Sequence, residues 1–231
     1  VINKLNSIQR MEVTYGRVPQ AEILDKVLQA DIDKIKLTME HLDHGIFDQA
    51  VETILQAKTI YIIGIRSCAP LAHFLSFYLN LVVDDVRLIQ TNSASEIFEQ
   101  MIRINEKDVI IGISFPRYSM HTLKAMEFAN NRNAKVITLT DSIHSPMNLY
   151  SSCNLIARSD MASIVDSLVA PLSVINALVV ALCMKKQQEV VDTLESMEKI
   201  WDEYKVYSND EINSIDDSVK LSFAGLGEDD V

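Results

Sequence analysis

The sequence predicts a three-layer, doubly wound α/β fold on a five-stranded parallel sheet with strand order 2-1-3-4-5. Two observations lead to this prediction. Short runs of β-branched and apolar residues alternate with stretches whose apolar residues recur at helical spacing. The strand runs are apolar throughout, which is typical of a parallel sheet covered by helices on both faces.

Each element follows from its local pattern. Two helices are expected ahead of the sheet, over 20–42 and 46–57, because apolar residues fall there at helical spacing. The five strands are expected at 59–65, 86–90, 108–114, 135–140 and 153–157. Helices are expected over 70–82, with Pro70 in the first turn, and over 93–104 and 120–131. A short helix or turn follows at 145–150, and a long helical stretch, with room for one break, covers 163–204.

Composition limits the possible functions. The 231 residues suit one domain plus extensions, and the net charge of −11, without a Lys/Arg-rich stripe, argues against nucleic-acid binding by this chain alone. Three distant cysteines fit a reduced cytosolic protein, and we expect no signal peptide. The apolar run 168–184 is short for a membrane span and fits a core or a dimer interface. The chain begins at Val1 without an initiator Met, so we expect a fragment.

Two short polar loops, 64–69 and 114–119, follow the first and third predicted strands, and each leads into a helix. Free N–H groups and the positive end of the helix dipole point out of such loops. In the predicted order these strands are neighbours at the topological switch point, where ligands bind beyond the carboxyl ends of strands. We therefore expect one site for a phosphate-bearing small molecule. No Gly-x-Gly-x-x-Gly or Walker-type sequence is present, which argues against a dinucleotide fold.

The chain resembles the sugar isomerase (SIS) domain in the version found in RpiR-type bacterial transcription regulators. Four segments carry the resemblance: 62–67 (IIGIRS), 108–119 (DVIIGISFPRYS), 136–142 (VITLTDS) with Ser145-Pro146, and 166–172 (DSLVAPL). The resemblance implies a flavodoxin-like SIS domain over 20–204 that senses a phosphorylated sugar. It also implies that 1–19 is the remnant of a link to a missing helix-turn-helix domain. Residues 205–231 form an acidic tail.

The family pattern implies that hydroxyls of the two loops hold the phosphate. These roles fall on Ser67 in the first loop, and on Ser114 and Ser119 in the second. The sequence departs from the broader pattern at four positions where small residues are common: Arg66, Cys68, Pro116 and Arg117. Proline removes an N–H donor and arginine adds a fixed charge, so Arg66 or Arg117 can replace backbone groups at the anion. The same departures fit a sugar acid with a second anionic group.

Each candidate also has a structural interpretation. The three serines suit helix caps, and Arg66 suits an ion pair across a subunit interface. Residues 91–93, including Thr91 and Ser93, suit contacts with sugar hydroxyls or a plain turn, and Cys68 suits a reactive or a packed thiol. His41 and His44 are three positions apart, but no further ligand completes a metal site, so we expect neither a metal nor another cofactor.

Taken together, the sequence predicts a cytoplasmic, non-enzymatic effector domain that contacts DNA only through its missing N-terminal domain. We expect no membrane partner and a homodimer or homotetramer built on the helices within 20–57 and 163–204. Two alternatives stay open. One is an aldose–ketose phosphate isomerase with Glu96 or His121 as the acid/base group. The other is a dimerisation module whose pocket has decayed.

Overall fold

The structure, a computed structural model, describes residues 8–9, 19–91, 93–160 and 166–206. It contains two compact units that divide between Gln187 and Gln188. Most of the expected linker 1–19, most of the acidic tail 205–231, and Asn92 lie outside the described residues.

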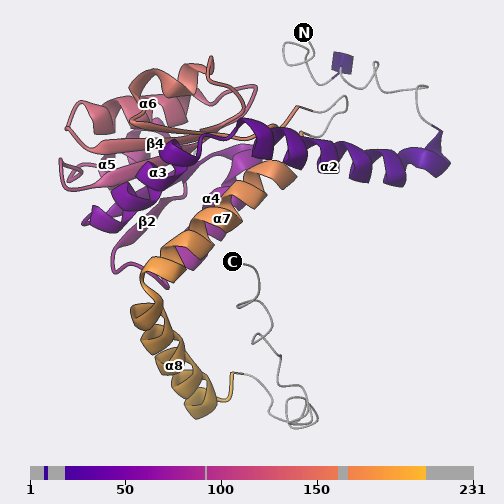
Figure 1. The fold of residues 1–231 in the computed structure, drawn as a ribbon. Coiled ribbons are helices and arrows are strands. Elements are labelled where there is room, and N and C mark those ends of the chain that lie inside the picture. The colour runs from indigo at the N-terminus through magenta and orange to yellow at the C-terminus, as the bar shows by residue number, and fades with distance from the viewer. Residues whose placement is uncertain (1–7, 10–18, 92, 161–165, 207–231) are drawn as a thin grey trace, which may run out of the picture. The chain divides into compact units, whose positions relative to one another are not determined.

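The first unit is built on a five-stranded parallel sheet in the order β2-β1-β3-β4-β5, which confirms the predicted order. Figure 1 shows the ribbon, with β2 and β4 labelled among the helices that surround the sheet. The strands are β1 (Ile60–Gly64), β2 (Val86–Ile89), β3 (Val109–Ile113), β4 (Lys135–Thr140) and β5 (Cys153–Ile156). Every residue of the central strands β1 and β3 is buried. Their side chains meet apolar neighbours on both faces, which is why their sequences are apolar throughout.

Helices cover both faces of this sheet. One face carries α5 (Ala94–Gln100) and α6 (Met120–Asn130), and its core joins Tyr61 and Ile63 of β1 to Ile97 and Met126. The other face carries α3 (His44–Gln56), α4 (Ala69–Leu79) and α7 (Val169–Lys185), and α2 (Ile23–His41) packs against α7. Short 3₁₀ turns lie at η2 (Gln20–Glu22), η3 (Arg66–Cys68) and η4 (Pro146–Tyr150).

Two helical predictions were wrong at their boundaries. The stretch predicted over 163–204 contains the one break that the prediction allowed, because α7 ends at Lys185 and α8 (Gln187–Tyr204) begins two residues later, but its predicted start was wrong. Residues 166–168 are not helical, and 163–165 lie outside the described residues. The helix predicted over 93–104 ends at Gln100. There the N–H of Met101 is shared between the carbonyls of Ile97 and Phe98, a tightening typical of a last turn.

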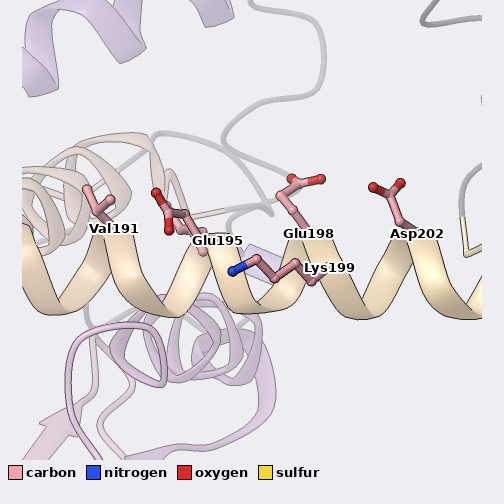
Figure 2. A pocket seen from close by; sticks show the side chains of 6 residues that line it. Val191, Glu195, Glu198, Lys199 and Asp202 are labelled. Carbon is pink, nitrogen blue, oxygen red and sulfur yellow. The ribbon is translucent and has the colours of Figure 1, made fainter.

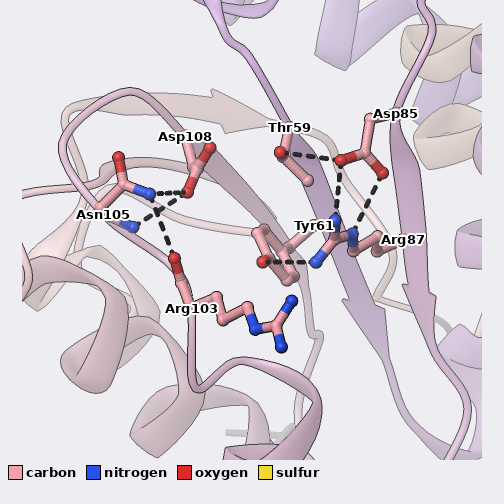
Figure 3. A network of polar contacts seen from close by, with 7 residues as sticks. All are labelled: Thr59, Tyr61, Asp85, Arg87, Arg103, Asn105 and Asp108. Carbon is pink, nitrogen blue, oxygen red and sulfur yellow. Dashed lines mark hydrogen bonds and ion pairs between the residues drawn. The ribbon is translucent and has the colours of Figure 1, made fainter.

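Polar contacts close the amino edge of the sheet (Figure 3). The guanidinium of Arg87 donates to both carboxylate oxygens of Asp85 at 3.0 and 2.9 Å and to the Tyr61 hydroxyl at 3.2 Å. Thr59 donates to the same Asp85 carboxylate at 2.9 Å. Beside β3, Asp108 Oδ2 accepts from the backbone and side-chain N–H groups of Asn105, both at 2.9 Å. The first set of contacts links the starts of β1 and β2, and the Asn105–Asp108 bonds hold the turn before β3, all at the edge opposite the two loops.

Helix α2 is tied to the carboxyl edge of the sheet at two points. The hydroxyl of Ser167, just before α7, donates to Asp31 Oδ1 at 2.5 Å. The N–H of Arg158, just after β5, donates to Thr38 Oγ1 at 2.9 Å. Arg158 lies two residues after β5, and the N–H of Ser167 donates to the carbonyl of Ser159 at 3.1 Å, so α2 is bonded to segments at the edge that carries the polar loops. Over the described residues, no single helix is both long and apolar enough to cross a membrane, and α7 and α8 pass that test only as a pair.

Candidate functional site

The two predicted loops lie side by side at the carboxyl edge of the sheet. Strands β1 and β3 are paired along their whole length, with Gly64 opposite Ile113. The first loop leaves β1 after Gly64 and the second leaves β3 after Ile113, so both begin at the same level of neighbouring strands, about 4.8 Å apart. The structure therefore brings the loops to the switch point of the sheet, as the sequence predicted.

The first loop is a single 3₁₀ turn, η3, that leads directly into α4. Arg66 takes a left-handed backbone conformation with φ 58°, and the side chains of Arg66 and Ser67 are exposed. Cys68 is buried instead, and burial raises the pKa of its thiol, although hydrogen bonds from the Phe115 backbone and from Ser67 act in the opposite direction. A protonated, buried thiol packs the first loop against the second, which favours the structural interpretation of Cys68.

The second loop brings two of its serines together. The buried Oγ of Ser114 accepts a hydrogen bond from the Ser119 N–H at 3.0 Å, and the Oγ of Ser119 caps α6 by accepting from the Thr122 N–H at 3.2 Å. Both hydroxyls are thus used as acceptors, and each keeps an O–H group able to donate to an anion. Arg117 lies between them in sequence with an exposed side chain, after a cis Pro116–Arg117 peptide bond.

A third loop, which the sequence prediction did not include in the site, joins the second. The Tyr118 hydroxyl donates to Asp141 Oδ1 at 2.8 Å, and the Thr140 hydroxyl lies within reach of Asp141 Oδ1 at 3.3 Å and of Ser145 Oγ at 2.9 Å. Burial and the bond to Asp141 raise the pKa of Tyr118 to about 12. Asp141, Thr140 and Ser145 are all buried. The stretch 136–146 carried part of the family resemblance, and that was the one sequence signal for this loop.

After β2, Thr91 and Ser93 make local contacts. Thr91 donates to the Glu96 carboxylate and accepts from the Ser93 N–H at 3.0 Å, and Ser93 Oγ lies 3.0 Å from Ser95 Oγ. This is the geometry of a turn that starts α5. Contact of Thr91 or Ser93 with a ligand stays a prediction. Glu96 and His121 are exposed in the first turns of α5 and α6.

A separate hollow of about 370 Å³ runs along α8 (Figure 2). Its lining within the described residues comes from this one helix: Val191, Leu194, Glu195, Glu198, Lys199 and Asp202. Three of these side chains are carboxylates against one amine, and carboxylates repel a phosphate. The lining of this hollow therefore disfavours a phosphate-bearing ligand. Across residues 8–9, 19–91, 93–160 and 166–206, no three His, Cys, Asp or Glu side chains are grouped so that they could hold a metal ion.

The model of the SIS domain family matches residues 53–181, more than half of the chain. An HTH-type transcriptional regulator of Clostridium perfringens is 25% identical over 134 residues, which are 58% of this chain and 47% of that protein. A second such regulator, of Caldanaerobacter subterraneus, is 24% identical over 188 residues, 77% of this chain and 64% of that protein. The chain thus spans between about half and just under two thirds of these regulators.

Solved structures share the fold. The sugar isomerase domain of an RpiR transcription factor from Sphaerobacter thermophilus aligns with a TM-score of 0.74 at 22% identity, covering 77% of this chain and 99% of that one. The Vibrio vulnificus NanR protein complexed with ManNAc-6P aligns with a TM-score of 0.70 at 20% identity, covering 82% and 72%. Phosphoheptose isomerase from Neisseria gonorrhoeae aligns at 0.61 and 16% identity, covering 71% and 98%. The fold is therefore shared by regulators and by enzymes.

Proposed function

The chain belongs to the SIS domain family, and we propose that it is the effector-sensing domain of an RpiR-type transcriptional regulator. In this proposal a phosphorylated sugar binds between the first and second loops, without catalysis. DNA binding resides in a helix-turn-helix domain outside the chain. Residues 1–19 are the link to that domain, 20–204 the sensory domain and 205–231 an acidic tail, in a protein that acts in the cytoplasm. The sequence similarity to HTH-type transcriptional regulators supports this role.

The observation that carries the proposal is the Ser114–Ser119 pair at the head of α6, next to the first loop. Two hydroxyls fixed by backbone N–H bonds of 3.0 and 3.2 Å lie at one helix N-terminus, and Ser67 lies at the N-terminal end of α4. Oriented hydroxyls and the positive ends of two helices favour a phosphate group. The exposed side chains of Arg66 and Arg117 can add charge-assisted hydrogen bonds to it. The NanR protein complexed with ManNAc-6P supports the ligand class.

A sensor must couple its ligand to a second part of the molecule. Helix α2 precedes the first strand in the sequence. Its residues Asp31 and Thr38 are hydrogen-bonded to segments at the carboxyl edge of the sheet. A ligand that binds one arrangement of this edge more tightly than another shifts the equilibrium between the two, and with it the placement of α2. In this proposal α2 transmits the change to the attached DNA-binding domain.

We also propose that the chain forms a homodimer or homotetramer. Exposed apolar side chains run along α2, among them Leu24 (68%), Leu28 (52%) and Met39 (69%), and α7 adds Val180 and Met184. Because α2 and α7 pack against each other, these residues belong to neighbouring elements. Light scattering coupled to size-exclusion chromatography, run at several concentrations, tests the proposal, and a monomer at all of them refutes it.

Binding of phosphosugars tests the function directly. Thermal-shift and calorimetric titrations with hexose, pentose and amino-sugar phosphates are expected to identify a binder at millimolar concentration or below. Ser114→Ala together with Arg117→Ala is expected to weaken that binder, because the pair removes one hydroxyl donor and one fixed charge. Ser196→Ala is the control, since among the described residues the Ser196 hydroxyl donates within its own helix, to the Asp192 carbonyl of α8. If no phosphorylated sugar or sugar acid shifts melting at millimolar concentration, the sensing proposal fails.

The isomerase alternative rests on Glu96 and His121, which are exposed at the N-terminal ends of α5 and α6, and on the fold shared with phosphoheptose isomerase. Within the described residues, Glu96 has Thr91 as a hydrogen-bond partner, a local contact that a surface carboxylate makes as readily as a catalytic one. A coupled assay for aldose–ketose interconversion distinguishes the two functions. Turnover that disappears in Glu96→Gln or His121→Ala would overturn the assignment as a sensor.

A further inference from the structure

Asp141 directly follows β4 and therefore lies next to the second loop. In the parallel pairing of β3 with β4, Ile113 is opposite Leu139, and the N–H of Ser114 donates to the Leu139 carbonyl at 3.2 Å. Ser114 and Thr140 thus leave the sheet at the same level, and Asp141 is the next residue along. A ligand bound at Ser114 and Ser119 has the Asp141 loop as its neighbour on the β4 side.

A bond between side chains joins these two loops. Tyr118, in the second loop, donates to Asp141 Oδ1 at 2.8 Å, and Thr140 lies 3.3 Å from the same oxygen. The raised pKa of Tyr118, about 12, keeps the phenol protonated and donating throughout the neutral range. Over the part of the chain that the structure describes, no hydrogen bond reaches Asp141 Oδ2, so this oxygen can accept from a ligand.

The segment on the other side, after β2, also carries a carboxylate, in the first turn of α5. Beyond β2, the Glu96 carboxylate accepts from Thr91. The two phosphate-binding loops, after β1 and β3, are therefore flanked along the sheet edge by Glu96 on the β2 side and by Asp141 on the β4 side. If the phosphate lies between the two central loops, a sugar that extends along the sheet edge meets a carboxylate in either direction.

We propose, on the basis of the phosphosugar function above, that Asp141 selects a ligand whose sugar end is uncharged or cationic and excludes phosphorylated sugar acids. A ligand carboxylate next to Asp141 repels it, whereas a hydroxyl or amine donates to it. Tyr118 is a positioning residue, because its bond to Asp141 holds the second loop and so places Ser119. The ligand is then an aldose, ketose or amino-sugar phosphate.

Matched ligand pairs test this selectivity. Each pair joins an aldose phosphate to the aldonic acid of the same carbon skeleton, such as glucose 6-phosphate with 6-phosphogluconate and ribose 5-phosphate with 5-phosphoribonate. Isothermal titration of the wild-type chain is expected to give at least about tenfold tighter binding of the aldose phosphate. Asp141→Asn is expected to reduce this ratio to about threefold or less. Raising the ionic strength is expected to narrow the wild-type ratio as well, since salt screens the repulsion.

Three further variants locate the effect. Asp84→Asn removes the same charge from an exposed site at the amino edge of the sheet and is expected to leave the ratio unchanged. Tyr118→Phe is expected to weaken both members of a pair by the same factor, because it loosens the second loop and keeps the Asp141 charge. If Glu96→Gln allows the sugar acid to bind more tightly and Asp141→Asn does not, the assignment of the selectivity to Asp141 is wrong.

The proposed function and this selectivity fail in different ways. If the wild-type chain binds the sugar acid as tightly as the aldose phosphate, phosphosugar binding stands as the function and the exclusion of sugar acids is refuted. This measurement uses the wild-type chain alone, so it does not depend on whether any variant folds. If no phosphosugar of either kind binds, the function itself fails, and the selectivity fails with it. Thermal melting of each variant, compared with wild type, shows whether a lost affinity reflects a lost fold.

Discussion

Replacing Gly64 by alanine is expected to disturb the first loop through a clash with its backbone. Gly64 is the last residue of β1, and a Cβ atom added there would lie 2.7 Å from the carbonyl oxygen of Cys68 and 3.0 Å from the Cβ of Ala72. The first contact is with backbone of the turn η3, and the second is with α4. Neither can be relieved by rotating a flexible side chain, so the turn or the helix must move.

The size of the effect follows from two opposing contributions. Overpacking a buried site costs about 1–3 kcal/mol in the free energy of unfolding. Alanine recovers about 0.4–1 kcal/mol by restricting the unfolded chain. Since the clash is with backbone, the upper end of the overpacking cost applies, and we expect a net loss of about 2 kcal/mol in the free energy of unfolding. For a chain of this length, that lowers the melting temperature by about 4–8 °C.

Two other glycines supply the controls. At Gly112 an added Cβ would meet Met126 Sδ at 2.4 Å, and this thioether can rotate away, so Gly112→Ala is expected to lower the melting temperature by less. At the exposed Gly45 the nearest atom is Asp43 Oδ1 at 3.2 Å, and Gly45→Ala is expected to be neutral or slightly stabilising. Scanning calorimetry measures all three, and phosphosugar titration is expected to show weaker binding for Gly64→Ala alone. Melting of Gly64→Ala within 1 °C of the Gly45→Ala variant would refute this reasoning.

Three further predictions concern a cap, an ion pair and the thiols. Ser119→Ala removes the acceptor for the Thr122 N–H and is expected to lower the free energy of unfolding, measured by denaturant titration, by about 1 kcal/mol. Ser119→Asp is expected to keep the cap, so equal losses of stability in the two variants would contradict this prediction. The pKa of Asp85 is lowered by its hydrogen bond from Arg87, so its stabilising effect is present above the ordinary value of 3.8 and is lost as the pH falls through the lower folded value. The melting difference between wild type and Asp85→Asn should therefore be constant from pH 5 to 8 and vanish in acid, and a difference that grows in acid would have the wrong sign. Burial raises the pKa of all three cysteine thiols, and Cys183 is the half-buried one. We therefore expect Cys183 to react first with a thiol reagent at neutral pH, and Cys68 to react only as fast as the protein unfolds. Fast labelling of a Cys183→Ser variant would contradict this, because it would show that Cys68 or Cys153 is accessible in the folded protein.

The order of strands and the placement of the first two loops were predictable from the sequence. Uninterrupted apolar runs identify buried parallel strands, and the doubly wound order then follows from general rules of topology. The predicted order places Ser114 beside the first loop. The boundaries of the helices were harder to predict. The break between α7 and α8 falls at Lys186, where neither proline nor glycine marks it.

The third loop could not be predicted because it depends on contacts between distant residues. Tyr118 and Asp141 are 23 positions apart, and neither has a pattern that pairs it with the other. Their bond arises because β3 and β4 end at the same level and the second loop turns Tyr118 toward β4. The local role of Thr91 was hidden for a similar reason. A threonine after a strand suits a ligand or a turn equally well, and its bond to Glu96 is a matter of geometry.

The strand order also determines when the site can form as the protein is synthesised. Strand β1 is made first, yet it lies between β2 and β3, so the first loop acquires its neighbour only once β3 and the start of α6 have left the ribosome. The Asp141 loop follows about twenty residues later. At a synthesis rate of about 5–20 residues per second, the nascent chain spends several seconds with the apolar strand β1 made and unpaired on its β3 side. Chaperone binding to nascent chains truncated between β1 and β3 is therefore expected to be strongest just before β3 emerges.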